Sequence, residues 1–364
     1  MMTSTTRPTL AVHVVFHPAS NEGRLLARAI DGALNGRDPV TGQRSDVTAH
    51  LAIPTFFLPE ETAPDRVGLP PQPAPGESPD EWLRRLWPGE RNLVVVLSDE
   101  HLAAPPVAGE GDPAHDWSVW VRRYCPAPER LAAADHNRIL LVQVSEEGWP
   151  LHADFQSLSF CRTTPPRELE IRQRQLVRRV IQELCRLVAS EHAGAEAEPA
   201  PIRVFISHAK ADLAQEPRVV EALLNALKGD QPVRSWVDSG RIQPGTSFVE
   251  AIHGAIRDHS MLCVVTDHYS GRPWCRIETI EAKRQERPMV AIDALATRDL
   301  LASPYLGNIP VLRWSATDAA SSQAQANLAI DLLVAETLRR GHARLELRRS
   351  VHREPGSSPA RRSP

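Results

Sequence analysis

The second half of the chain alternates short apolar runs, rich in β-branched residues, with stretches of helical periodicity. The apolar runs predict five strands, at residues 202–206, 233–237, 261–266, 289–292 and 309–314. Helical spacing follows the first two strands, at Val220, Leu223, Leu224 and Leu227, and again at Phe248, Ile252 and Ile256. Two more helices are expected, at residues 274–286 and from the last strand to near Arg340. This alternation predicts an α/β domain with a doubly wound, flavodoxin-like parallel sheet.

The first half shows the same rhythm less regularly. Its apolar pattern predicts a helix at residues 22–34 and strands at residues 10–16, 51–57, 93–97 and 139–144. A longer helix is expected over residues 167–191, with arginines on its remaining faces that should be solvated. Residues 59–79 are rich in proline and predict an irregular loop. The first half is therefore expected to be α/β as well, and an internal repeat is one interpretation.

Length and composition predict two domains, since 364 residues are enough for two separate cores. The segment after residue 192 is rich in Ala, Glu and Pro, as linkers are, and the last residues have the composition of a disordered tail. The expected parts are an N-terminal domain (1–165), a connecting helix (166–192), a linker (193–201), a second domain (202–345) and a disordered tail (346–364).

Charge and cysteine content exclude several functional classes. A formal net charge of -3 disfavours a nucleic-acid partner. No apolar run is long enough to cross a bilayer and no signal segment is evident, so a cytoplasmic protein without membrane contact is expected. The five cysteines have no short CxxC or Cys/His spacing, which argues against a metal site or a disulfide framework.

The polar residues that follow the predicted strands are the candidates for a functional site. In an open parallel sheet, ligands bind in the crevice beyond the carboxyl ends of the strands. Trp274 and Glu278 are one helical turn apart and share a face of the following helix. The other candidates at this edge are Phe205, Ser207, His208, Lys210, Asp238, Arg241, Tyr269 and Ser270.

Four short motifs here resemble the successive motifs of bacterial TIR (Toll/interleukin-1 receptor) domains. They are FISHA at residues 205–209, WVD at 236–238, YS at 269–270 and WCRIE at 274–278. Their order and spacing are similar to those of the family, over about a third of the chain. In TIR enzymes the glutamate of the WCxxE pattern is catalytic, so the resemblance implies a TIR-type fold and assigns this role to Glu278.

The resemblance to TIR enzymes implies cleavage of the N-glycosidic bond of NAD, and the chemistry of this reaction agrees with a single carboxylate. Breaking the bond between nicotinamide and ribose develops positive charge on the sugar, which a fixed carboxylate stabilises. Nicotinamide leaves as a neutral ring, so no general acid is required. Trp274 or Phe205 would stack on the nicotinamide, and Arg241 or Lys210 would meet the pyrophosphate. NAD is then a substrate, and no cofactor or metal ion is expected.

Each candidate also has a structural alternative. A glutamate near a helix start is more often a partner of the exposed N–H groups than a catalyst. Trp274 and Phe205 would equally serve as core residues, and Asp238 is expected to shape the loop that follows it. Ser207 and His208 can satisfy neighbouring backbone groups. The local sequence offers His208 no acidic partner, so a Ser/His/Asp triad is not supported.

The first half also contains a short sequence that is similar to one of the motifs of the second half. The sequence WVRRY at residues 120–124 can be aligned with WCRIE at 274–278, which places Tyr124 where the carboxylate of the second half stands. Under this alignment the N-terminal domain is a non-catalytic TIR-like module suited to sensing or assembly. The alternative is an unrelated α/β domain with its own ligand.

The resemblance to bacterial TIR enzymes implies an NAD+ nucleosidase that acts in antiphage defence or NAD-depletion toxicity. TIR domains gain activity by assembly, so a homo-oligomer formed through TIR–TIR contacts is expected on activation, with an upstream sensor or trigger. Two alternatives stay open: a TIR scaffold in signalling without turnover, and a synthase of cyclic ADP-ribose. Hydrolysis and cyclisation pass through the same oxocarbenium-like species, so the sequence does not separate them.

Overall fold

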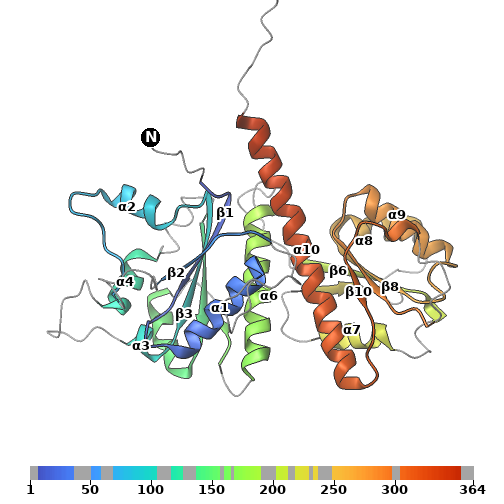
Figure 1. The fold of residues 1–364 in the computed structure, drawn as a ribbon, viewed down its shortest axis with the longest axis horizontal. Coiled ribbons are helices and arrows are strands. Elements are labelled where there is room, and N and C mark those ends of the chain that lie inside the picture. The colour runs from blue at the N-terminus through green and yellow to red at the C-terminus, as the bar shows by residue number, and fades with distance from the viewer. Residues whose placement is uncertain are drawn as a thin grey trace, which may run out of the picture. The chain divides into compact units, whose positions relative to one another are not determined.

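The structure is a computed structural model that describes residues 7–36, 51–58, 69–104, 116–125, 137–155, 160–164, 168–189, 202–211, 218–228, 233–236, 248–296 and 304–353. Its internal contacts divide the chain into two units (Figure 1). The first unit contains Met1–Gly194 and Gly341–Pro364, and the second contains Ala195–Arg340. The helix expected to connect two domains belongs to the first unit, and the expected linker lies outside the described residues.

The second unit is built on a sheet of five parallel strands in the order β10-β9-β8-β6-β7. The strands are β6 (Ile202–Ser207), β7 (Val233–Trp236), β8 (Ser260–Val265), β9 (Met289–Asp293) and β10 (Val311–Arg313). All five coincide with strands predicted from the apolar runs. Long apolar runs identify these strands because both faces of a parallel sheet are buried.

Helices cover both faces of this sheet. They are α7 (Val219–Leu227), α8 (Phe248–Asp258), α9 (Pro273–Arg284) and α10 (Ala319–Arg353), with a short 3-10 helix, η5 (Pro304–Leu306). Figure 1 shows α8 and α9 on one face and α7 and α10 on the other. The core under α8 and α9 includes Phe205, Ile252, Met261, Cys263 and Met289. The predicted doubly wound α/β fold is therefore confirmed.

The first unit also has five parallel strands, in the order β2-β1-β3-β4-β5. The strands are β1 (Leu10–Val15), β2 (Thr55–Leu58), β3 (Arg91–Ser98), β4 (Asn137–Gln143) and β5 (Phe160–Arg162). The helices are α1 (Asn21–Asn35), α2 (Pro79–Leu86), α3 (Glu100–Ala103), α4 (Trp117–Tyr124), the 3-10 helix η2 (Glu146–Phe155) and α6 (Leu169–Ala189). In chain order, both sheets have the flavodoxin-like arrangement 2-1-3-4-5. The two units thus share one topology.

Two strands of the first unit differ from the prediction. β2 begins at Thr55, whereas the apolar pattern placed its start at Leu51. Ala52 adopts a positive φ of 53°, which turns the chain, and Pro54 has no N–H to donate to a ladder. The sequence pattern missed β5, because three residues are too few to show a period.

Two helices also differ from the prediction. The arginines of α6 are not all solvated, because Arg172 and Arg178 are buried within the first unit. Helix α10 continues to Arg353, beyond both its predicted end near Arg340 and the predicted start of a disordered tail at residue 346. Burial of Leu345 and bonds from Arg349 to Thr9 Oγ1 and the Arg7 carbonyl hold its last turns to the first unit.

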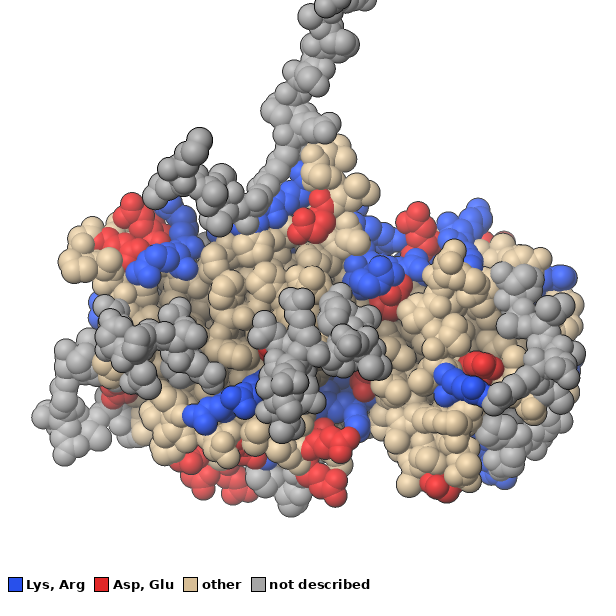
Figure 2. Space-filling model, viewed as in Figure 1, with Lys and Arg blue, Asp and Glu red and all other residues tan. Residues whose placement is uncertain are grey.

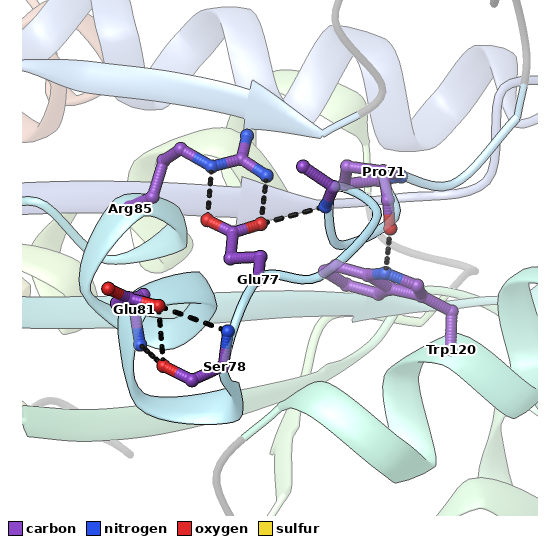
Figure 3. A network of polar contacts seen from close by, with 7 residues as sticks. Pro71, Glu77, Ser78, Glu81, Arg85 and Trp120 are labelled. Atoms are coloured by element: carbon purple, nitrogen blue, oxygen red, sulfur yellow. Dashed lines mark hydrogen bonds and ion pairs between the residues drawn. The ribbon is translucent and has the colours of Figure 1, made fainter.

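Side-chain bonds fix the segment that leads into α2 (Figure 3). Ser78 and Glu81 form a capping box, in which the Ser78 hydroxyl accepts from the Glu81 N–H and the Glu81 carboxylate accepts from the Ser78 N–H. Arg85 donates twice to the Glu77 carboxylate, at 2.9 and 2.8 Å. Trp120 Nε1 donates to the Pro71 carbonyl at 2.6 Å. The end of the proline-rich segment is therefore anchored to both α2 and α4.

The apolar character of the helices and the distribution of charge on the surface are relevant to possible partners. Among the described residues, no helix has the length and apolar character that crossing a membrane requires. On the face drawn in Figure 2, basic and acidic side chains are interspersed over both units. Several ion pairs of the described residues join side chains of one helix, such as those of Arg339 and Arg340 with Glu336.

A buried histidine in β1 should make the first unit sensitive to acid. The His13 side chain donates from Nε2 to Asn92 Oδ1 at 3.0 Å and stacks on Phe56. Burial lowers the pKa of His13 from 6.5 to about 4. Between these pH values the unfolded chain binds a proton that the folded unit does not bind. The free energy of unfolding should therefore fall by about 3 kcal/mol as the pH drops from 6.5 to 4.

Urea unfolding across this pH range measures the effect. A His13→Phe variant removes the titrating group but keeps a ring against Phe56. We expect its stability to depend less on pH than that of the wild type. An identical pH dependence in the two proteins would contradict the assignment to His13.

Candidate functional site

The site lies at the carboxyl edge of the second sheet, where the strand order reverses. The chain enters the sheet at β6, pairs on one side with β7, and returns on the other side with β8. Ser207, the last residue of β6, pairs in register with Cys263 of β8. Ligands of open α/β sheets bind at such a switch point, in the crevice beyond the strand ends.

Glu278 is brought to this edge by α9. Pro273 occupies the first turn of the helix, where its missing N–H costs nothing, and Glu278 follows in the second turn. Its side chain is buried, with only 5% of the residue exposed, and Oε2 is hydrogen-bonded to Ser207 Oγ at 2.5 Å. A carboxylate in the second turn is beyond the reach of the helix N-terminus, which weakens the dipole-partner alternative.

A chain of hydroxyl groups continues from Ser207 into the core. The Tyr269 hydroxyl lies 2.8 Å from Ser207 Oγ and 3.1 Å from Thr279 Oγ1. Thr279 in turn donates to the Cys275 carbonyl at 2.7 Å. Burial raises the pKa of Tyr269 well above 10 and that of the neighbouring Cys263 thiol to about 12. Both groups therefore stay neutral around the carboxyl group of Glu278.

The other predicted site residues lie in different surroundings. Phe205 is buried in the core between the sheet and α8, as expected for a core residue. Trp274 is 41% exposed, one turn before Glu278. His208 is half-buried, with Nδ1 3.4 Å from the Ile206 carbonyl. Lys210 and Ser270 are exposed, whereas Asp238 and Arg241 lie outside the described residues. The structure thus brings Ser207 and Glu278 into direct contact.

Sequence reasoning placed Tyr269 among the candidates at this edge without giving it a role, and it did not single out Thr279 or Cys263. Tyr269 follows a strand end, which is a signal, but nothing in the sequence tells that its hydroxyl turns inward. Thr279 is adjacent to Glu278 in the chain and points about 100° away around the helix. Hydrogen bonds through Tyr269 and Ser207 link it to the carboxylate.

The equivalent positions of the first unit are apolar. Val15 and Val96 form the last pair in the β1–β3 register, as Ser207 and Cys263 do between β6 and β8. Leu102 follows β3 by four residues, as Tyr269 follows β8. All three apolar side chains are buried in one cluster. At these positions the first unit therefore lacks the polar groups that surround Glu278.

The residues that the alignment of WVRRY with WCRIE pairs do not have equivalent environments in the two units. Trp120 is 1% exposed and belongs to the core of the first unit, whereas Trp274 is exposed. Tyr124 packs against Trp82 and Trp120. The two tryptophans thus have different roles, although the units share a strand order.

Comparison with known proteins assigns the second half to a family. Among curated proteins, none matches this chain. Two solved structures align with most of it: tagatose-6-phosphate ketose/aldose isomerase from Escherichia coli (11% identity, 93% of this chain and 84% of that one, TM-score 0.21) and the C-terminal domain of glucosamine-fructose-6-phosphate aminotransferase from Francisella tularensis (8%, 93% and 86%, 0.21). These TM-scores are too low to indicate a shared overall fold. Residues 204–326 match the family model described as TIR domain. The second half of the chain therefore contains a TIR domain.

Proposed function

We propose that this protein is an NAD+ nucleosidase that cleaves the bond between nicotinamide and ribose, with Glu278 as its essential carboxylate. The observation that carries the proposal is the buried carboxyl group of Glu278, fixed by Ser207 at the switch point of a TIR domain. A scaffold that only binds other TIR domains has no need of a buried carboxylate at this edge. Burying a carboxylate costs hydration free energy. Hydrogen-bond partners offset part of this cost, and a catalytic role would explain why the rest is tolerated.

The surroundings of Glu278 suit the charge that develops in the reaction. Cleavage creates positive charge on the ribose, and a fixed negative group stabilises it more strongly in a low-dielectric site than in water. Ser207 holds one carboxylate oxygen in place, so little reorganisation is required. Nicotinamide departs as a neutral ring, and Glu278 needs no acidic partner. Attack of water on the sugar then gives ADP-ribose, whereas attack by a group of the same molecule gives a cyclic form.

The exposed side chains near Glu278 have the chemistry for binding NAD. Trp274 offers an accessible indole one turn away, which would stack on the nicotinamide ring. Lys210 follows β6 at the same edge and is exposed, so it would meet the pyrophosphate. These two roles, and a similar role for Arg241, are part of the proposal.

The outer face of α9 supports assembly through TIR–TIR contacts. Trp274, Ile277 and Ile280 are exposed at successive turns, and Tyr305 of the neighbouring η5 is exposed as well. Exposed apolar side chains gathered on one helix are typical of interaction surfaces. We therefore propose that a homo-oligomer is the active form. A cytoplasmic location, an upstream trigger and a role in antiphage defence belong to the proposal through the resemblance to bacterial TIR enzymes.

Nicotinamide release from NAD by the purified protein tests the proposed function. We expect release that rises more steeply than in proportion to protein concentration, because assembly would build the active form. Mass spectrometry of the products identifies ADP-ribose or its cyclic form. A predominant cyclic product would assign the protein as a synthase. No release at any concentration, including under crowding that promotes assembly, would favour the scaffold alternative.

A further inference from the structure

We infer that Tyr269 is a positioning residue for Glu278, on which it acts through Ser207 and Thr279. Tyr269 itself is only 1% exposed, so a substrate in the crevice has no access to it. Its effect on turnover rests on the proposed function, whereas its effect on the geometry of Glu278 does not.

The hydroxyl group of Tyr269 closes a ring of contacts between the end of β6 and α9. Ser207 Oγ lies 2.5 Å from Glu278 Oε2 and 2.8 Å from the Tyr269 hydroxyl. The Tyr269 hydroxyl lies 3.1 Å from Thr279 Oγ1, and Thr279 directly follows Glu278 in α9. Two adjacent residues of α9 are therefore attached to Ser207, one directly and the other through Tyr269. Attachment at two points restricts both the shift and the rotation of the helix at the strand end.

The loop between β8 and α9 fixes the backbone of Tyr269. Its N–H donates to the Thr266 carbonyl at 3.0 Å, and its carbonyl accepts from the Arg272 N–H at 3.1 Å. Each bond closes a turn of four residues, and Arg272 is the N-cap of α9. The Cys263 thiol of β8 is hydrogen-bonded to the Tyr269 side chain as well. A hydroxyl held in this way can select one of the three staggered rotamers that Ser207 could otherwise adopt.

The position of the Glu278 carboxylate depends in part on this rotamer of Ser207. Glu278 also has interactions besides its bond to Ser207, so other groups share in holding it. An active site nevertheless requires its charged groups to lie within about 0.5 Å of the productive geometry. Loss of the Tyr269 hydroxyl should therefore displace the carboxylate slightly without removing it. Its cost in turnover should be far smaller than the cost of replacing Glu278 itself.

The first unit shows that this strand order does not require hydroxyl groups at these positions. Val15 has the register position of Ser207, and Leu102 follows β3 as Tyr269 follows β8. Both apolar side chains are buried in one cluster. Apolar packing is sufficient there, and it avoids the cost of burying polar groups. The buried hydroxyls of the second unit are therefore explained by the carboxylate beside them rather than by the fold.

Tyr269→Phe removes the hydroxyl and keeps the buried ring. Ser207 then loses its contact with the loop, and α9 loses its second attachment to the strand end. We expect kcat for nicotinamide release to fall about tenfold, less than the loss that a full ångström of misplacement can cause. KM for NAD should change by less than about twofold, because Tyr269 makes no contact with the substrate.

Variants of Thr279 separate the loss of a hydroxyl from a change in packing. Thr279→Val has nearly the shape of the wild type but no hydroxyl, so kcat should fall by a factor similar to that of Tyr269→Phe. Thr279→Ser keeps the hydroxyl and should restore kcat. Thr337→Val is the matched control, because Thr337, like Thr279, donates to the carbonyl four residues earlier on its helix and contacts a second hydroxyl, that of Ser260. This control should leave kcat and KM unchanged.

Crystal structures of the full-length wild type and of Tyr269→Phe give a second measurement, which does not depend on turnover. We expect one rotamer of Ser207 and one of Glu278 in the wild type. In Tyr269→Phe, Ser207 should occupy a second rotamer and the Glu278 carboxylate should be displaced. Circular dichroism checks that each variant is folded, and Thr279→Val provides the same comparison if Tyr269→Phe does not fold.

The two measurements keep this inference separate from the proposed function. A Glu278 carboxylate that stays in place in Tyr269→Phe would overturn the inference, whatever the rate of release. A displaced carboxylate with unchanged kcat, in a protein that releases nicotinamide, would overturn its catalytic part. Absence of release from the wild type would count against the nucleosidase, and the crystal structures would then decide the positioning role on their own.

Discussion

Replacing Glu278 with glutamine is expected to lower nicotinamide release about a thousandfold, a loss typical of removing one preorganised electrostatic group from an active site. The amide has nearly the same shape and can still bond to Ser207, so the packing of α9 against the sheet should be kept. It carries no negative charge to stabilise the developing cation on the ribose. Because that charge appears in the transition state, kcat should fall more than the affinity for NAD.

Glu281→Gln is the matched control for this experiment. Glu281 lies on the same helix and is buried to a similar degree, but its carboxylate bonds to Arg284 on the helix surface. We expect this variant to retain nicotinamide release. Equal release by the wild type and Glu278→Gln would remove Glu278 from the mechanism. An equal loss in both variants would point to damage of α9 rather than to lost catalysis.

The fold of the TIR domain could be predicted from sequence because its strands are buried on both sides. Each strand is then a continuous apolar run, and β6, β8 and β9 were located to within a residue or two at each end. The first unit was harder to predict. β5 has three residues, and β2 starts late because of the backbone at Ala52. Such local geometry leaves no periodic signal.

The candidate site was predictable only as far as chain position determines it. The sequence singled out Ser207 and Glu278 because one ends a strand and the other belongs to a motif on a following helix. Their contact, and the link through Tyr269 to Thr279, depend on how α9 packs against β6 and β8. A similar limit affected the comparison of the two halves. The alignment was based on the shared tryptophans, Trp120 and Trp274, which lie in different environments. The strand register identified the equivalent positions of the two sheets.

Arg172 shows why a pattern of arginines on a helix does not establish a solvated face. Its side chain is only 3% exposed, and the guanidinium group reaches from α6 to the ends of two strands. It donates to the carbonyl of Val144, which follows β4, at 2.9 Å, and to the carbonyl of Thr163, which follows β5. It also pairs with Glu22 on α1. One side chain therefore connects two helices and two strands of the first unit.

Arg172→Leu should lower the free energy of unfolding of the first unit by about 3–5 kcal/mol, because leucine leaves two main-chain carbonyls and Glu22 without this donor. Arg174→Leu, on the same helix, is the control. Arg174 pairs with the exposed Glu170, and its loss should change stability by less than about 0.5 kcal/mol. Urea unfolding followed by tryptophan fluorescence reports mainly on this unit, which holds Trp82, Trp87, Trp117, Trp120 and Trp149. Equal midpoints for the two variants would mean that the buried bonds of Arg172 contribute no more than a surface ion pair.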